Sequence, residues 1–285
     1  SGMVSDVSND DIVRLMVGRE LQNRFNAMKE NVSNLAHDTV FEVRNVTSRD
    51  RKKVRDISFS VCRGEILGFA GLVGSGRTEL MNCLFGVDKR AGGEIRLNDK
   101  DISPRSPLDA VKKGMAYITE SRRDNGFFPN FSIAQNMAIS RSLKDGGYKG
   151  AMGLFHEVDE QRTAENQREL LALKCHSINQ NITELSGGNQ QKVLISKWLC
   201  CHPEVIIFDE PTRGIDVGAK AEIYKVMRQL ADDGKVILMV SSELPEIITV
   251  CDRIAVFCEG RLTQILTNRD DMSEEEIMAW ALPHE

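Results

Sequence analysis

The chain has 285 residues, 41% of them hydrophobic and 28% charged, with a net charge of −5 and a pI of about 5.7. This composition is typical of a globular protein, and the acidic balance argues against a nucleic-acid-binding protein, which usually carries a basic surface. Apolar runs such as Val205–Phe208 are too short to span a membrane, and the seven cysteines form no CxxC pattern. We therefore expect a cytosolic, reduced chain without a disulfide framework or a zinc site.

The first 38 residues are polar and carry a helical rhythm over Asn9–Phe25. Ser8 precedes acidic residues and an apolar helix, and Ser273 near the end of the chain does the same. We expect residues 1–38 to be a linker and the tail of a preceding copy of the unit with which the chain ends. The plainer alternative is two unrelated capped helices.

From residue 39 onward, strand patterns alternate with helix patterns, which predicts a layered α/β fold with a mainly parallel core sheet. A polar, largely helical stretch is expected over 121–180, with a glycine-rich break at 146–153. The other expected helices cover 78–86, 189–201, 218–233 and 244–250. The expected strands cover 40–46, 57–61, 65–70, 94–97, 115–119, 205–208, 236–240 and 253–257.

The segment after the 65–70 strand has the spacing of a phosphate-binding loop, with arginine at the lysine position: Gly71-Leu72-Val73-Gly74-Ser75-Gly76-Arg77-Thr78. Glycines let successive amides point at one phosphate, and the helix that follows adds its positive end. The Thr78 hydroxyl suits Mg²⁺. Because a forked guanidinium differs from an ammonium, we expect nucleotide binding to survive at Arg77 more readily than fast hydrolysis. A glycine-rich turn without a ligand is the alternative.

Two carboxylates, Asp209 and Glu210, end the apolar 205–208 strand. Adjacent acids at the end of a buried strand are costly unless a cation or a proton meets them. Asp209 suits Mg²⁺, and Glu210 suits the polarisation of an attacking water. The alternative is a strand whose acidic end is simply exposed to solvent. The phosphate loop upstream disfavours this alternative.

A third motif, Leu185-Ser186-Gly187-Gly188-Asn189-Gln190-Gln191, opens a helix between the other two. Its serine hydroxyl and glycine amides form an anion site of their own. The three motifs in this order closely resemble the ABC ATPases over about residues 40–265. The resemblance implies a P-loop NTPase fold of the ABC type, with a mainly parallel core sheet flanked by helices, an antiparallel β subdomain and a helical signature subdomain over about 121–200. It implies a nucleotide-binding domain at 39–265 and a C-terminal helix at 266–285.

In that family, two domains pack head to tail around ATP and Mg²⁺, and the resemblance implies a role for each matching residue. Mg²⁺ would be held by Thr78, Asp209 and Glu120, and the catalytic groups would be Glu210, Asp209, Ser242 and Glu120. The chain's own nucleotide would contact Gly71, Gly74, Ser75, Gly76, Arg77, Thr78 and Glu79. The γ-phosphate bound on the partner domain would face Ser186, Gly187, Gly188 and Gln190, with Asp216 in the loop that crosses between the halves.

Four short phrases narrow the resemblance to the second halves of carbohydrate importers of the ribose, galactose, xylose and allose type: MVGREL at 16–21, GRTEL at 76–80, DEPTRG at 209–214 and VSSE at 240–243. The implied partners are another nucleotide-binding domain, sugar permease subunits and, indirectly, a periplasmic sugar-binding protein. Nucleic acid is not among them. The implied location is peripheral, on the cytoplasmic face of the inner membrane.

The phosphate-loop side departs from the family pattern, while the signature side does not. Besides Arg77, Glu120 replaces a glutamine, Ser242 replaces the switch histidine, and residues 46–54 lack the aromatic that stacks on adenine. We expect a degenerate site of its own and an intact signature that serves a partner. A nucleotide-dependent regulatory module without turnover is the runner-up, and a soluble protein acting on DNA or ribosomes is disfavoured. The segment 127–129, Phe-Phe-Pro, is either a contact surface for the membrane partner or ordinary core.

Overall fold

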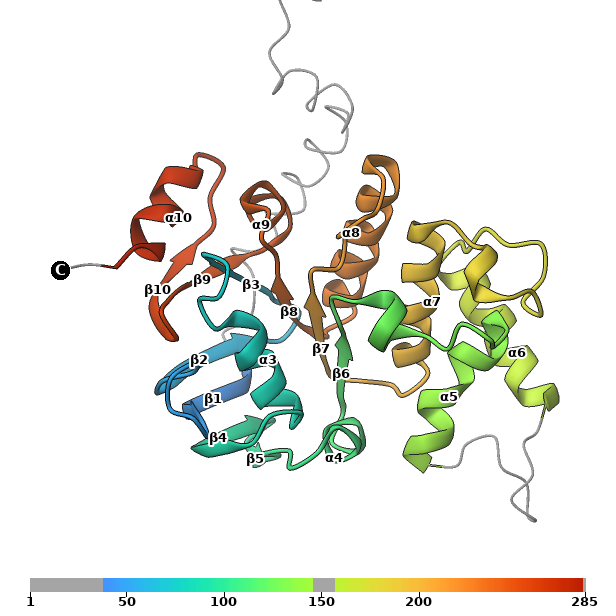
Figure 1. Cartoon of the computed structure of the whole chain (residues 1–285), viewed down its shortest axis with the longest axis horizontal. Helices are drawn as coiled ribbons and strands as arrows, with labels where there is room; N and C mark the ends of the chain where they lie inside the picture. The colour runs from blue at the N-terminus through green and yellow to red at the C-terminus, as the bar shows by residue number, and fades with distance from the viewer. Residues whose placement is uncertain (1–37, 146–156, 284–285) are drawn as a thin grey trace, which may run out of the picture.

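The computed structural model describes residues 38–145 and 157–283 and shows a sheet core with a helical lobe beside it (Figure 1). The expected helix over Asn9–Phe25 and the break at 146–153 lie outside these residues. The core is a six-stranded sheet in the order β10-β9-β3-β8-β7-β6, parallel except for β10. Its strands are β3 (Ile66–Gly71), β6 (Met115–Ile118), β7 (Val205–Asp209), β8 (Val236–Val240), β9 (Arg253–Cys258) and β10 (Arg261–Thr267).

Strand β3 shows why the central strands are apolar throughout instead of alternating. Leu67 and Phe69 pack into the core on one face of the sheet, whereas Ile66 and Ala70 pack into the core on the other face. A strand covered on both faces has no solvent side, so it needs no polar residues. The prediction of a mainly parallel central sheet is confirmed.

One face of this sheet is covered by a second, antiparallel sheet and two helices. The second sheet has the order β2-β1-β4-β5 and comprises β1 (Thr39–Ser48), β2 (Ile57–Cys62), β4 (Arg90–Leu97) and β5 (Lys100–Asp101). The helices are α3 (Arg77–Phe85) and α4 (Pro107–Lys112). The sequence patterns did not predict β5 or α4, because two and six residues are too short to show a period.

The opposite face is covered by α8 (Val217–Asp232), α9 (Leu244–Val250) and α10 (Glu274–Ala281). The expected C-terminal helix from residue 266 begins later than predicted, because β10 pairs with β9 as far as Thr267. The helix starts only after Ser273, whose Oγ accepts a hydrogen bond from the amide of Glu276 at 3.2 Å. This serine is the N-cap that the sequence had suggested.

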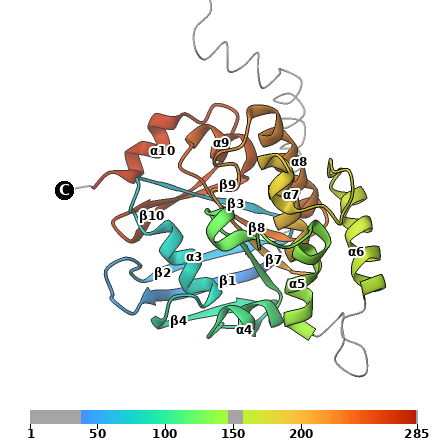
Figure 2. The same cartoon turned by 45° about the vertical axis from the view of Figure 1, so that its right-hand side comes forward.

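The helical lobe contains the π-helical turn η3 (Arg122–Gly126), α5 (Ile133–Asp145), α6 (Glu157–Leu170), the 3₁₀ turn η4 (Ile182–Glu184) and α7 (Gly187–Leu199). Figure 2 shows α5, α6 and α7 grouped at one side of the sheet core. The prediction of a helical stretch reaching 180 is wrong at its end, because the chain leaves the helix after Leu170 and Ala172 adopts a φ of 46°. A separate apolar cluster fills the lobe, and it includes Phe127, Ile133 and Leu194.

Aromatic rings join this lobe to the sheet core. Phe85 of α3 lies 5.4 Å from the ring of Tyr117 on β6 and 5.9 Å from the ring of Trp198 on α7, centroid to centroid. Both contacts are edge-to-face, the geometry that aromatic quadrupoles favour. The helix after the phosphate loop and the helix after the signature therefore share one aromatic contact.

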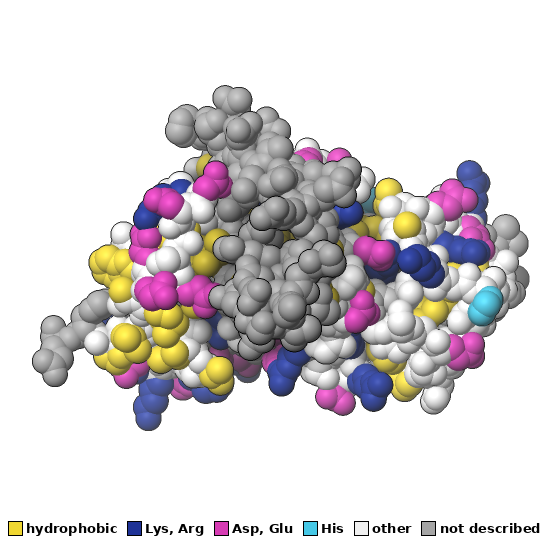
Figure 3. Space-filling model, turned by 90° about the horizontal axis from the view of Figure 1, so that it is seen from above, with side chains coloured by type: hydrophobic (Ala, Val, Ile, Leu, Met, Phe, Trp, Pro, Cys, Tyr) yellow, Lys and Arg dark blue, Asp and Glu magenta, His cyan; other side chains and the backbone are white. Residues whose placement is uncertain are grey.

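Charged side chains of both signs are mixed over the described part of the surface seen in Figure 3. Within the described ranges, no helix has both the length and the apolar character needed to cross a bilayer.

The strand register brings the predicted motifs to one edge of the core sheet. Phe69 and Asp209 both pair with Val240, and Ile118 pairs with Phe208. Because these strands are parallel, their carboxyl ends meet at the same edge. The phosphate loop, the acidic pair, Ser242 and Glu120 all follow directly from this edge.

Candidate functional site

The phosphate loop connects β3 to α3 through three glycines with positive φ. Gly76, at a φ of 107°, shows the need for glycine, since an added Cβ would lie 2.2 Å from the carbonyl oxygen of Lys53. Ser75 is buried, and its Oγ has no hydrogen-bond partner among the described residues. A buried hydroxyl at the start of α3 fits a phosphate oxygen, and the helix end favours an anion there.

Arg77 turns inward from the first position of α3. Its Nη1 donates to the carbonyl oxygen of Ser241 at 2.6 Å, and the residue is only 7% exposed. Burial lowers the pKa of the guanidinium, although the negative charges of Glu210 and Asp209 oppose this change. The side chain thus joins α3 to the end of β8. In this conformation the Nη1 donor of Arg77 is bonded to the protein backbone, whereas the sequence had suggested that the guanidinium pairs with phosphate.

Asp209 receives hydrogen bonds on both carboxylate oxygens. Thr78 Oγ1 donates to Oδ1 at 3.2 Å, and the hydroxyl of Tyr117 donates to Oδ2 at 2.9 Å. Burial raises the pKa of Asp209 despite these two bonds and the nearby charge of Arg77. Two of the three predicted metal ligands, Thr78 and Asp209, therefore lie together. Tyr117 was missed, and its signal was a hydroxyl in the otherwise apolar run MAYI.

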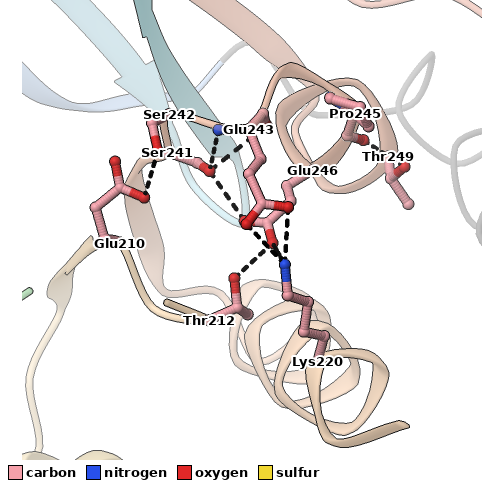
Figure 4. A network of polar contacts seen from close by, with 9 residues as sticks. All are labelled: Glu210, Thr212, Lys220, Ser241, Ser242, Glu243, Pro245, Glu246 and Thr249. Atoms are coloured by element: carbon pink, nitrogen blue, oxygen red, sulfur yellow. Dashed lines mark hydrogen bonds and ion pairs between the residues drawn. The ribbon is translucent and has the colours of Figure 1, made fainter. Parts of the chain in front are cut away.

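Glu210, expected to polarise the attacking water, lies beside Ser242, the residue at the switch position. Ser242 Oγ lies 3.2 Å from Glu210 Oε2 (Figure 4). Burial raises the pKa of Glu210, while the Ser242 hydrogen bond and the positive charge of Arg77 oppose the rise. Glu210 also has a φ of 51°, an uncommon value for a residue with a side chain and one that often marks functional sites.

A polar network behind Glu210 was not predicted from the sequence. Glu246, which is 5% exposed, accepts hydrogen bonds from Thr212 Oγ1 at 2.6 Å, Lys220 Nζ at 2.8 Å and Ser241 Oγ at 2.9 Å (Figure 4). Burial raises the pKa of Glu246, but the hydrogen bonds, that from Lys220 foremost, outweigh it and hold the pKa below its ordinary value. The network ties the segments after β7 and β8 to α8.

Two predicted residues are engaged away from the Thr78–Asp209 pair. Glu79 Oε1 accepts from Lys53 Nζ at 3.0 Å, which ties α3 to the loop where the adenine-stacking aromatic was expected. Glu120 is an ion-pair partner of Arg213. Glu120 lines a cavity of about 620 Å³ that is shared with the signature loop, including Gly187.

The signature residues occupy the start of α7 in different ways. Ser186 is exposed at the N-cap, and its Oγ accepts from Asn189 Nδ2 at 2.9 Å. Gly188 is buried, since an added Cβ would lie 2.5 Å from the Cβ of Ala219 on α8. Gln190 is also buried, and its amide donates to the carbonyl of Leu185 at 3.1 Å. Ser186 is therefore presented outward, whereas Gly188 and Gln190 support the loop from within.

Asp216 caps the first turn of α8. Its Oδ1 accepts from the amide of Ala219 at 3.0 Å, and the residue is exposed. It follows the loop that carries Arg213 and Gly214, both of which line the same cavity as Gly187. The structure thus brings the signature loop and the loop before Asp216 to one surface.

Known ATP-binding proteins of transporters are similar in sequence to this chain. The family model described as ABC transporter matches residues 54–213. Over all 285 residues the chain is 98% identical to the D-allose import ATP-binding protein AlsA of Escherichia coli (strain K12), of which it covers 56%. It is 43% identical over 280 residues, 98% of this chain and 54% of the relative, to a ribose import ATP-binding protein RbsA of Bacillus cereus.

Solved structures agree on the fold. MJ1267, an ATP-binding cassette of an ABC transporter, superposes with a TM-score of 0.72 at 21% identity, over 86% of this chain and 99% of that one. The chain spans about half the length of the curated relatives it matches. The family match covers more than half of the chain and contains the phosphate loop, the signature and the acidic pair. The chain belongs to the ABC transporter family of ATP-binding domains.

Proposed function

We propose that the chain is the second nucleotide-binding half of a motor protein that energises import of a monosaccharide, allose or a ribose-like sugar, through an ABC permease. The names of the two relatives support this, since both are import ATP-binding proteins about twice as long as this chain. Residues 1–38 would then be the linker and tail of the first half, 39–265 the nucleotide-binding domain and 266–285 a C-terminal extension.

The two phosphate-binding surfaces of this half would have different tasks. This proposal rests on a contrast between two residues. The guanidinium of Arg77 is buried and bonded to Ser241, whereas Ser186 is exposed at the start of α7. The signature would complete a productive ATP site on the partner domain. The chain's own phosphate loop would bind nucleotide and turn it over weakly or not at all.

Several residues would still hold a nucleotide at the chain's own loop. The amides at the start of α3 and the orphaned Ser75 hydroxyl would bind phosphate oxygens, and Thr78 with Asp209 would hold Mg²⁺. ATP supplies the phosphoryl group whose transfer to water releases free energy. Glu210 would orient that water, with its carboxylate held by Ser242. Glu120 could join the metal only after leaving Arg213.

Two exposed apolar surfaces suit the proposed partners. Leu72 and Val73 in the phosphate loop are 45% and 92% exposed, which suits contact with another nucleotide-binding domain. Phe128 and Phe131 stack at 5.1 Å and are both exposed, whereas Phe127 belongs to the lobe core. Only part of the Phe-Phe-Pro segment is thus available to a sugar permease. With such a partner the protein would lie peripherally on the cytoplasmic face of the inner membrane, with a periplasmic sugar-binding protein acting indirectly.

The test is Mg-ATP binding and steady-state hydrolysis by the purified chain, with Arg77→Ala beside it. We expect binding without appreciable turnover. Because Arg77→Ala also removes the bond to Ser241, its unfolding free energy is measured alongside. In the full-length protein with its permease, Ser186→Ala should reduce transport far more than Arg77→Ala. Equal losses of transport in the Ser186→Ala and Arg77→Ala variants would overturn the assignment of different tasks to the two phosphate-binding surfaces. Fast ATP turnover by the isolated chain that Arg77→Ala abolishes would overturn it as well.

A second candidate is a nucleotide-dependent regulatory module without turnover of its own, which the buried Arg77 also favours. It predicts that Ser186→Ala leaves ATP hydrolysis by the full-length protein unchanged. Hydrolysis measured beside transport in that same experiment therefore separates the two.

A further inference from the structure

Arg122 joins two segments of the signature surface that are far apart in the chain. It opens η3, two residues after Glu120. Its Nη1 donates to the carbonyl oxygen of Gly187 at 3.3 Å, and its Nη2 donates to the carbonyl oxygen of Gly214 at 3.1 Å. These acceptors lie 65 and 92 residues further along the chain. A single planar group thus spans the gap between the signature loop and the loop before Asp216.

Both acceptors are glycines. An added Cβ would lie 3.5 Å from Nη1 at Gly187 and 3.4 Å from Nη2 at Gly214. Gly214 also has a φ of 67°, which disfavours any other residue there. A side chain would meet the guanidinium at ordinary contact distance at both positions, so the backbone conformation of Gly214 is what restricts the residue type here.

Further contacts hold the rest of the same segment in place. Glu120 forms an ion pair with Arg213, in the same loop as Gly214. At the other end of η3, Lys197 of α7 donates to the carbonyl of Gly126. An added Cβ at Gly126 would lie 2.8 Å from Leu194 Cδ1, so the turn packs directly on α7. The turn η3 is consequently attached to α7 at two places. Arg122 binds the first residue of α7, and Gly126 contacts the last turns of α7.

The chemistry of arginine suits this bridge. A guanidinium presents its donors in a fixed planar fork, whereas a lysine ammonium is a single point on a flexible stem. Arg122 is partly buried, and burial lowers its pKa, with the nearby Arg123 acting in the same direction. A charged donor that is partly removed from water makes stronger bonds to carbonyls than an exposed one.

We propose that Arg122 is a positioning residue that fixes the signature loop relative to the loop before Asp216, so that both address the same nucleotide on the partner domain. This inference rests on the proposed role of the signature in completing a partner's ATP site. Arg122 does not need to touch the nucleotide, because its two bonded nitrogens both face backbone carbonyls.

The experiment uses the full-length motor protein assembled with its permease. Arg122→Ala, Arg122→Lys and Ser186→Ala are compared for kcat and for the KM for ATP. We expect Arg122→Ala to lower kcat about tenfold, the effect of losing roughly one charge-assisted hydrogen bond, with the KM changed less than about twofold. Arg122→Lys should recover only a small part of the loss. Arg123→Ala, which removes the same charge from the next, exposed position, is the matched control and should stay within about twofold of the parent.

The outcomes separate this inference from the function on which it rests. If Ser186→Ala leaves kcat unchanged, the proposed function fails. If Ser186→Ala lowers kcat but Arg122→Ala does not, or if Arg122→Lys restores it fully, only the positioning role is overturned. The double variant should be little worse than Ser186→Ala alone, and multiplication of the two losses contradicts action through the signature. Should Arg122→Ala fail to fold, Arg122→Gln replaces it with the same expected split, because one amide can reach one carbonyl.

Discussion

The hydroxyl of Tyr117 completes the hydrogen bonding of Asp209, a carboxylate that is 1% exposed. Tyr117→Phe keeps the ring and removes only the donor, so one buried carboxylate oxygen loses its partner. We expect the free energy of unfolding to fall by about 1–3 kcal/mol, measured by urea denaturation. In an Asp209→Asn background the same substitution should cost clearly less. Equal costs in the two backgrounds would show that the bond contributes nothing.

Lys197 is buried, and burial lowers its pKa to about 8. The unfolded chain therefore binds more protons at this residue between about pH 8 and 10.5, so the free energy of unfolding rises with pH across that window. Relative to Lys197→Met, the parent should gain up to roughly 3 kcal/mol over this range. Urea denaturation at several pH values measures the difference, and the exposed Lys225→Met corrects for loss of one charge. A difference that stays flat with pH contradicts a buried, titrating amine.

At the scale of elements, α8 and the segments after β7 and β8 are held together by one lysine and two glutamates. Lys220 lies 2.8 Å from both Glu246, which is buried, and Glu243, whose side chain is 54% exposed. We expect Glu246→Gln to lower the free energy of unfolding by about 2 kcal/mol, because it leaves a partly buried cation with a weaker partner. Glu243→Gln, the same change on the same lysine, should cost less than about 0.5 kcal/mol. Similar thermal unfolding midpoints for the two variants would contradict this ranking.

Elements with strong local signals were predictable from the sequence, and those without them were not. The apolar run 236–240 predicted β8 at its observed bounds, and the helix expected over 244–250 coincides with α9. Strand β10 was missed because its apolar residues are interrupted by a register shift between Leu262 and Gln264. Such a shift breaks the period-two pattern on which strand prediction depends.

The residues of the candidate site likewise divide into those with a local sequence signal and those without one. Ser75, Thr78, Asp209 and Ser186 belong to short motifs whose spacing alone indicates phosphate chemistry. Tyr117, Arg122 and Glu246 carry no such spacing, since each acts on a residue brought near only by the fold. The inward bond of Arg77 to Ser241 likewise joins residues 164 positions apart and has no local signal. Roles that depend on long-range contacts could therefore be assigned only from the structure.

At the scale of the whole molecule, the helical lobe presents neighbouring phenylalanines with opposite exposure. Phe127 is 7% exposed in the lobe core, and Phe128 is 48% exposed and stacked on Phe131. Phe128→Ser should weaken co-purification with the permease severalfold while leaving the unfolding midpoint nearly unchanged. Phe127→Ser should destabilise the lobe by about 3 kcal/mol or more. Undiminished co-purification of a folded Phe128→Ser variant would remove this surface from the proposed interface.

The aromatic contact between α3 and α7 also supplies an optical probe. The chain has two tryptophans, Trp198 at this contact and Trp280 on α10. In a Trp280→Phe variant, all indole fluorescence would come from Trp198. This ring belongs to α7, the helix of the signature, and touches α3, the helix of the phosphate loop. Lys197 Nζ lies 5.0 Å from the centre of that ring, so a nearby positive charge would also tune the emission wavelength. Rotation of the helical lobe against the sheet core could then be followed as a spectral change, without any attached dye.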